Sequence, residues 1–269
     1  LEDIFRDRIA QVAALNPVVV REVGEASPLG EDATVRFRIA ERPSRPGGRL
    51  VLDVMTRRAA YPRIALATPS YQAANVATAV AAAEATLDRA LDDGALRGAL
   101  EALRLPGRFE VLEEVPPLVA DGAHNPQAAA ALADAIAEAW PDPASRPFCV
   151  LGVLADKDAE GIIRALAPVV AGFVATQPVT SRALDAGQLG ATIARVVGTW
   201  PEVVPTLARA MPLGRLYGQE AGAIVTGSLY MAGQSKIVLN PPEDMPEPAA
   251  GKGPEEARRK LFNGEFGDV

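Results

Sequence analysis

The spacing of apolar residues in the first third of the chain predicts a small antiparallel sheet. Apolar and polar side chains alternate in residues 33–40 and 49–56, which is the pattern of strands with one buried face. Residues 45–48, Arg-Pro-Gly-Gly, are typical of a turn between two such strands. Residues 61–68 supply a third strand, and we expect the three to form a meander.

Helical spacing marks the segments on either side of these strands. Apolar residues recur at helical intervals in residues 4–15, and a short strand is expected at residues 18–20. The alanine-rich residues 72–90 predict a long helix, because alanine has the highest helix propensity. A further helix is expected over residues 95–103.

The second half of the chain alternates strands with helices. Short apolar runs without alternation, typical of strands buried on both faces, occupy residues 117–120, 148–154, 172–176 and 222–226. Helical patterns occur near residues 126–139, 158–167, 185–197 and 203–211. This order predicts a mostly parallel sheet with helices on both faces, so the fold class is α/β.

The length of 269 residues favours two domains. We expect a first domain over residues 1–112, which includes a linker at residues 105–116, and a second domain over residues 113–240. Residues 241–269 are rich in Pro, Glu, Gly and Lys, and we expect them to form a disordered tail.

Composition excludes several classes of protein. Cys149 is the only cysteine, so no intrachain disulfide can form, and its place in a predicted buried strand favours a core residue. His124 is the only histidine, which excludes a histidine-cluster metal site. The net charge of −7 argues against nucleic acid or an anionic membrane as a partner. With no bilayer-spanning apolar run and no signal-peptide pattern at its start, the chain is expected to be cytoplasmic.

The strongest candidate chemistry lies in residues 119–126, Val-Ala-Asp-Gly-Ala-His-Asn-Pro. A strand ends near Asp121, and Asn125 suits the N-cap of the following helix. Ligands of open α/β sheets bind at such strand ends, and helix N-termini favour anions. Asp121 could therefore accept hydrogen bonds from ribose hydroxyls, and His124 could contact a phosphate or carboxylate. A well-capped helix with an incidental acid and histidine explains the same residues equally well.

Four further segments place polar residues near strand ends: residues 105–110 with Arg108, residues 152–158 with Asp156 and Lys157, residues 180–183, and residues 226–229 with Ser228. Taken singly, each is explained by a turn, a helix cap or a solvated side chain. Their convergence on one edge of a parallel sheet favours a ligand site. The sequence contains no G-x-x-x-x-G-K-[ST] phosphate loop and no G-x-S-x-G nucleophile elbow.

Five segments in this order resemble folylpolyglutamate synthase/dihydrofolate synthase, a family of the Mur ligase superfamily. They are Leu105-Pro-Gly-Arg-Phe-Glu110, Asp121-Gly-Ala-His-Asn-Pro126, Gly152 to Asp158, Ser181-Arg-Ala183 and Thr226-Gly-Ser-Leu-Tyr230. The resemblance implies that the first domain is the later part of a central ATPase domain, and that a Rossmann-like ligase domain follows. The Asp-Gly-Ala-His-Asn-Pro form resembles the folate branch rather than the peptidoglycan ligases.

The resemblance also implies roles for particular residues. By their match to family positions, Asn75, Arg108 and Asp121 would contact ATP. Asn75 lies in Tyr71-Gln-Ala-Ala-Asn75, where tyrosine replaces the family's histidine. His124 and Ser228 would act catalytically, by organising the acyl-phosphate and glutamate side of the site. No metal ligand is expected among these residues.

The implied reaction uses ATP and Mg²⁺ to add L-glutamate to dihydropteroate or a reduced folate, and the implied protein is a monomer. Because the P-loop and the magnesium ligands of the family have no match here, we expect this chain to be a C-terminal portion that is inactive alone. Two alternatives are a non-catalytic module that binds nucleotides or amino acids, and a related ligase of cell-wall synthesis.

Overall fold

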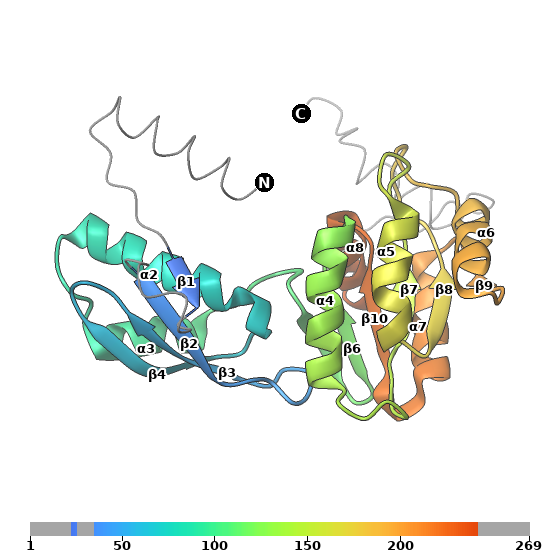
Figure 1. Ribbon diagram of the computed structural model, residues 1–269. Coiled ribbons are helices and arrows are strands. Elements are labelled where there is room, and N and C mark those ends of the chain that lie inside the picture. The colour runs from blue at the N-terminus through green and yellow to red at the C-terminus, as the bar shows by residue number, and fades with distance from the viewer. Residues whose placement is uncertain (1–22, 26–34, 242–269) are drawn as a thin grey trace. The chain divides into compact units, whose positions relative to one another are not determined.

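The computed structural model describes residues 23–25 and 35–241. The chain divides into two compact units: residues 1–42 with 49–103, and residues 43–48 with 104–269 (Figure 1). The helix predicted over residues 4–15, the strand at residues 18–20 and residues 242–269 of the predicted tail lie outside the described residues. Within residues 23–25 and 35–241, no helix combines the length and apolar character needed to cross a bilayer.

The first unit contains a four-stranded sheet in the order β1-β2-β3-β4. Its strands are β1 (Val23–Glu25), β2 (Val35–Glu41), β3 (Leu50–Met55) and β4 (Ala60–Leu66). Strands β2, β3 and β4 pair antiparallel, which confirms the predicted meander, whereas β1 pairs parallel with β2. The short strand β1, Val-Gly-Glu, has no alternating pattern that could have indicated it.

Among its described residues, the first unit has two helices, α2 (Ala73–Leu87) after the 3₁₀ turn η1 (Ser70–Gln72), and α3 (Asp93–Ala102). The core contains side chains from the strands and the helices, including Leu50, Leu52, Ile64, Val76 and Val80. One acid is buried on α2. The Glu84 side chain accepts hydrogen bonds from the Tyr61 hydroxyl at 2.7 Å and the Thr56 hydroxyl at 3.0 Å, which ties α2 to the sheet.

The second unit contains a six-stranded sheet in the order β5-β6-β10-β7-β8-β9. The strands are β5 (Glu110–Glu114), β6 (Pro117–Ala120), β7 (Phe148–Leu151), β8 (Gly172–Ala175), β9 (Glu202–Val203) and β10 (Ala223–Thr226). Only β5 runs antiparallel to its neighbour, and every other pair is parallel. This confirms the prediction of a mostly parallel sheet.

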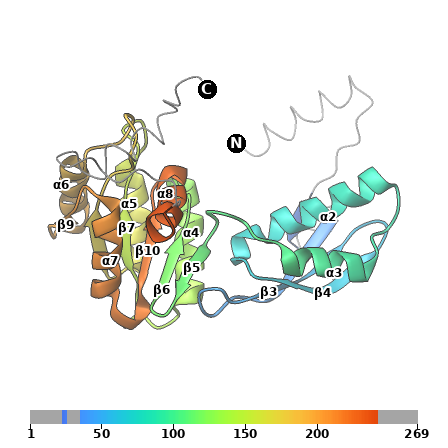
Figure 2. The ribbon, with the colours of Figure 1, turned by 180° about the vertical axis from the view of Figure 1, so that it is seen from behind.

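Helices cover both faces of this sheet, as the two opposite views show (Figures 1 and 2). They are α4 (Pro126–Ala139), α5 (Ala159–Leu166), α6 (Ala186–Val197), α7 (Leu207–Gly218) and α8 (Leu229–Leu239). Helices α4 and α5 pack together on one face, and α7 and α8 pack together on the other. The helix N-termini that follow β6 and β10 therefore open at the carboxyl edge of the sheet.

Four elements of the second unit differ from the prediction, and one is the short strand β9, which includes the first residue of the helix expected over residues 203–211. The segment predicted as a linker, residues 105–116, contains β5, whose sequence Glu-Val-Leu-Glu-Glu has neither the alternation nor the apolar run that would predict a strand. No sequence pattern predicts helix α8, because its apolar residues are not gathered on one face. Helix α7 begins later than expected and continues through Pro212 to Gly218.

Cys149 lies in β7 with 1% of its surface exposed, which confirms that it is a core residue. Burial raises the pKa of its thiol far above the ordinary range, and the thiolate is the reactive form. We predict that a chromogenic disulfide reagent finds no reactive thiol in the native chain and one equivalent after unfolding in urea. Stoichiometric reaction of the native chain within minutes would show that β7 is not buried.

Candidate functional site

The carboxyl edge of the second sheet brings together the segments that follow β6, β10 and β7. Backbone hydrogen bonds join them: Asp121 N donates to Val225 O at 3.0 Å, and Gly227 N donates to Ala123 O at 3.1 Å. Gly152 N donates to Thr226 O at 3.0 Å. The predicted convergence of these strand ends is therefore present, and it includes four of the five predicted site residues.

Asp121 lies directly after β6, and 3% of its surface is exposed. One carboxylate oxygen, Oδ1, accepts a hydrogen bond from Ala123 N at 2.8 Å. The other, Oδ2, accepts one from Phe109 N at 2.8 Å. A buried carboxylate requires such donors, because an unpaired charge in the interior is costly. Asp121 therefore fastens the turn that follows β6 to the loop at residues 105–110.

The loop at residues 105–110 has an unusual backbone on either side of Arg108. Gly107 has φ +65° and Phe109 has φ +50°, which is the left-handed region. For Phe109 this conformation costs about 1–3 kcal/mol, and the surrounding contacts must hold it. Besides the bond to Asp121, the buried Phe109 ring packs edge-on against Trp140 with centroids 6.1 Å apart. Gly107 O accepts a hydrogen bond from Gly122 N at 2.8 Å.

Arg108 is half-buried, and its guanidinium lies over Gly122. A Cβ atom at position 122 would lie 3.0 Å from Arg108 Nη1 and would overlap the Leu229 side chain. Glycine at position 122 thus leaves room for the guanidinium beside the first residue of α8. The guanidinium donates a long hydrogen bond, 3.4 Å from Nη1 to Gly107 O. Arg108 therefore presents a positively charged, planar donor group at the sheet edge.

His124 and Asn125 form the connection to α4. Asn125 Oδ1 accepts a hydrogen bond from Ala128 N at 2.8 Å, so Asn125 is the predicted N-cap. His124 Nδ1 lies 2.9 Å from Gly122 O. Because a carbonyl can only accept, we assign the proton of the neutral ring to Nδ1, which leaves Nε2 as an acceptor. The half-buried imidazole is thereby oriented by its own loop.

Ser228 follows β10 and is 1% exposed. Its hydroxyl accepts a hydrogen bond from Met231 N at 3.1 Å, so Ser228 is the N-cap of α8. The preceding Gly227 has φ +107°, and a Cβ atom there would overlap Gly152 O. Glycine is therefore required for β10 to approach β7 this closely and place Ser228 at the edge.

Asn75, the fifth predicted site residue, belongs to the first unit. It is exposed on α2, and its Nδ2 donates to Gln72 Oε1 at 2.7 Å. The other four predicted residues all belong to the second unit.

The segments after β7 and β8 are also joined at the sheet edge. Asp156 contacts Lys157 Nζ at 3.0 Å and the Arg182 guanidinium at 3.0 Å. Lys157 and then Arg182 hold the pKa of Asp156 below its ordinary value. Asp158 caps α5 by accepting a hydrogen bond from Gly161 N at 2.8 Å. Asp158 thus caps a helix and the other three residues form surface ion pairs, and neither role requires a ligand.

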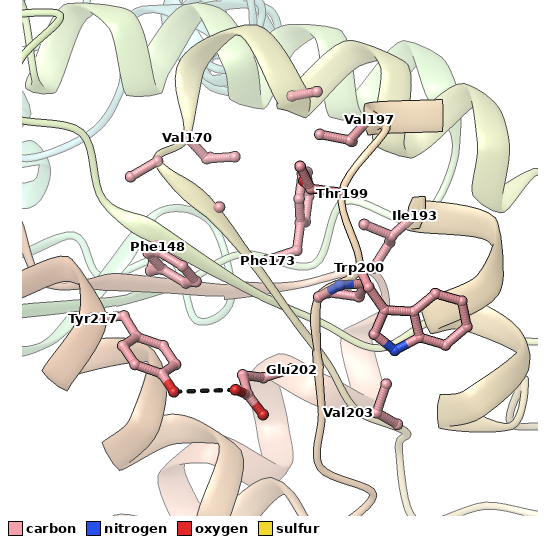
Figure 3. Close-up of a pocket in the computed structure, with 14 residues that line it drawn as sticks. Phe148, Val170, Phe173, Ile193, Val197, Thr199, Trp200, Glu202, Val203 and Tyr217 are labelled. Atoms are coloured by element: carbon pink, nitrogen blue, oxygen red, sulfur yellow. Dashed lines mark hydrogen bonds between the residues drawn. The ribbon is translucent and has the colours of Figure 1, made fainter. Parts of the chain in front are cut away.

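A cavity of about 700 Å³ opens elsewhere in the second unit, at the amino edge of its sheet (Figure 3). Its walls include Phe148 and Gly172, the first residues of β7 and β8, together with Trp200 and Glu202. Tyr217 completes one side, and its hydroxyl lies 3.3 Å from Glu202 Oε1. None of the predicted site residues lines this cavity. Sequence reasoning missed it, because its residues come from separate elements and share no motif.

No metal centre is found in the part of the chain that the structure describes. Residues 23–25 and 35–241 contain no group of three or more His, Cys, Asp or Glu side chains that could hold an ion. The arrangement at the carboxyl edge instead combines a guanidinium, a buried hydroxyl and the N-termini of α4 and α8, which favour an anionic ligand. The half-buried imidazole of His124 lies beside them with Nε2 as an acceptor.

Comparisons with known proteins show that the region containing this sheet edge is similar to ligases. Residues 107–229 match the family described as Mur ligase, glutamate ligase domain. The chain is 31% identical over 262 residues to the dihydrofolate synthase/folylpolyglutamate synthase of Mycobacterium tuberculosis, covering 87% of this chain and 52% of that enzyme. The chain therefore spans about half the length of this relative.

Solved structures show the same fold. The M. tuberculosis folylpolyglutamate synthase complexed with ADP and AMPPCP superposes with a TM-score of 0.70 and 31% identity, over 77% of this chain and 49% of that one. A bifunctional folylpolyglutamate synthase/dihydrofolate synthase from Yersinia pestis, complexed with AMPPNP and Mn ion, gives a TM-score of 0.65 and 25% identity. It covers 86% of this chain and 50% of the other.

The two bonds of the Asp121 carboxylate predict a measurable cost for Asp121→Asn. An amide has one oxygen, so its NH₂ group would face either Phe109 N or Ala123 N and leave that donor unpaired. We expect the free energy of unfolding of the nucleotide-free chain to fall by about 1–3 kcal/mol in urea titrations.

The matched control is Asp134→Asn, because Asp134 is an exposed acid on α4. We expect its effect to stay within about 0.5 kcal/mol. Equal stability of wild type and Asp121→Asn would show that Asp121 does not hold the loop.

Proposed function

Because the chain is a homologue of folylpolyglutamate and dihydrofolate synthases and residues 107–229 match a glutamate ligase domain, we propose that it is part of an ATP-dependent ligase. The ligase adds L-glutamate to a folate-type acceptor, either dihydropteroate or a reduced folate. In this proposal the first unit is the later part of the central ATPase domain, and the second unit, which contains the matched residues 107–229, is the ligase domain. The site acts in a monomeric, cytoplasmic enzyme.

The proposed reaction has two steps. An oxygen of the acceptor carboxylate attacks the γ-phosphorus of ATP, which releases ADP and leaves an acyl phosphate. The amine of L-glutamate then attacks the acyl carbon, loses a proton, and expels inorganic phosphate as the amide bond forms. Both steps develop negative charge on phosphoryl or carbonyl oxygens, so positioned cations and hydrogen-bond donors stabilise them.

We assign nucleotide contacts to Arg108, Asp121 and Asn75. The half-buried Arg108 offers a planar set of donors at the sheet edge, which suits phosphate or a ribose oxygen. Each Asp121 oxygen already accepts one backbone N–H, and an acid that follows a strand at this edge suits a ribose hydroxyl. Asp121 therefore serves ATP mainly by fixing the loop that carries Arg108. Asn75 has an exposed amide, and its assignment to ATP rests on its match to the family position alone.

We assign the acyl-phosphate and glutamate side to His124 and Ser228. His124 directly precedes the N-cap of α4, and Ser228 is the N-cap of α8. Both helix N-termini favour a phosphate or carboxylate. The Ser228 hydroxyl accepts one hydrogen bond from Met231 N, so its proton stays available to an oxygen of the substrate. The geometry of these two caps at one edge is the observation that carries the proposal.

A divalent ion accompanies ATP in this chemistry and neutralises charge on the phosphates. The described residues offer no cluster for it, so we assign it no ligand among them. The 269 residues also contain no G-x-x-x-x-G-K-[ST] sequence. We therefore propose that γ-phosphoryl transfer requires groups outside this chain, and that the chain alone makes no product.

The test is ligation with ATP, Mg²⁺, radiolabelled L-glutamate and either dihydropteroate or tetrahydrofolate. The assay compares the 269-residue chain with the product of its complete reading frame. We expect labelled amide product from the complete protein and none from the chain alone, and the preferred acceptor identifies the activity. Absence of product from the complete protein with both acceptors would refute the folate assignment and favour a module that only binds nucleotides or amino acids.

Arg108→Ala in the complete protein tests the assigned nucleotide contact. Loss of a charge-assisted hydrogen bond of about 1.5–3 kcal/mol predicts a KM for ATP raised roughly 10- to 100-fold. The KM for glutamate should change by less than about 2-fold, as should both constants in the control Arg209→Ala, an exposed arginine on α7. An unchanged KM for ATP would show that Arg108 does not contact the nucleotide.

A further inference from the structure

The Glu110 carboxylate joins two elements that carry the proposed site. Glu110 is the first residue of β5, at the end of the loop that holds Arg108. Its Oε2 accepts a hydrogen bond from Gly107 N at 2.9 Å. Its Oε1 lies 2.8 Å from Nζ of Lys236, in the last turn of α8. One side chain therefore connects the backbone beside Arg108 to the helix that begins after Ser228.

The contact with Gly107 fixes a buried part of the loop. Gly107 is buried, so its N–H needs a partner within the protein. A Cβ atom at this position would lie 3.2 Å from Ala232 Cβ on α8, so the loop backbone packs directly against that helix. Loss of the Glu110 oxygen would leave Gly107 N unpaired and free the turn that precedes Arg108.

Lys236 holds the carboxylate in this position. The side chains of Glu110 and Lys236 are 24% and 45% exposed, and an exposed ion pair alone stabilises a protein little. This pair differs from the exposed cluster of Glu160 with Arg164 and Arg195, which joins side chains only. In the Glu110 pair the second carboxylate oxygen bonds a buried backbone N–H, so the orientation of the side chain is transmitted to the loop.

We propose that Glu110, oriented by Lys236, is a positioning residue for Arg108 and thereby sets the affinity of the enzyme for ATP. Neither the Glu110 nor the Lys236 side chain is proposed to contact a substrate. The inference rests on the proposed function, in which Arg108 binds the nucleotide. Through Glu110 and Lys236, the loop that carries Arg108 is held against α8.

The experiment measures kcat and KM for ATP and for glutamate in the complete protein. Because small displacements of a binding group cost much affinity, we expect Glu110→Ala to raise the KM for ATP about 10-fold and leave the KM for glutamate within about 2-fold. Glu110→Gln retains an acceptor for Gly107 N, so it should restore part of the loss. Lys236→Met should raise the KM for ATP about 3-fold, a smaller effect because the loop contact remains.

The double variant tests whether the two residues act together. Glu110→Ala combined with Lys236→Met should match Glu110→Ala alone within about 2-fold, because Lys236 acts only through the carboxylate. Glu160→Gln is the matched control, an exposed carboxylate with two cationic partners in the same unit, and it should leave each KM unchanged. Thermal unfolding of every variant separates loss of folding from loss of affinity. Lys236→Met changes a partly exposed side chain and leaves the hydrogen bond from Gly107 N to Glu110 in place.

The outcomes separate this inference from the proposed function. If the wild-type complete protein makes no product with either acceptor, the proposed function fails and the inference with it. If the wild type is active but Glu110→Ala leaves the KM for ATP unchanged, or raises both KM values equally, Glu110 does not position Arg108 and only the inference fails.

Discussion

The candidate site depends on one buried carboxylate. Asp121 accepts hydrogen bonds from Phe109 N and Ala123 N, one on each oxygen. These bonds join a loop before β5 to the turn after β6, and further backbone bonds connect that turn to the segment after β10. Arg108, His124 and Ser228 are positioned by these three segments. Because Asp121 is almost fully buried, its charge requires these donors, and the loops are fixed before any ligand binds.

The strain in the Arg108 loop explains why several contacts hold it. A left-handed backbone at Phe109 costs about 1–3 kcal/mol. One hydrogen bond to a charged acceptor contributes about 1.5–3 kcal/mol, and burial of the phenyl ring contributes a similar amount. The loop is therefore stable without nucleotide, with Arg108 held between Gly107 and Phe109. Glu110 adds a second carboxylate contact from the other end of the loop.

Sequence patterns predict the elements and helix caps that are determined by residues close together in the chain. The buried apolar runs predicted the parallel strands, and the polar residue before Pro126 predicted the cap at Asn125. Sequence patterns do not predict contacts between residues that are far apart in the chain. Nothing near Asp121 indicates that its acceptor role is toward Phe109, and nothing near Glu110 indicates Lys236. The acid Glu84 lies in an alanine-rich helix, and only the fold supplies the hydroxyls of Thr56 and Tyr61 that accommodate it.

Amide hydrogen exchange in the nucleotide-free chain, resolved by NMR for Phe109 and Ala123, tests directly whether the Asp121 carboxylate fixes the Arg108 loop. If the buried carboxylate of Asp121 binds both amides, their exchange should be as slow as that of the central strand β10, because exchange then requires opening of the same core. Exchange at the rate of unprotected loop amides would show that Asp121 does not hold these two N–H groups, and it would mean that the Arg108 loop is not fixed until a ligand binds.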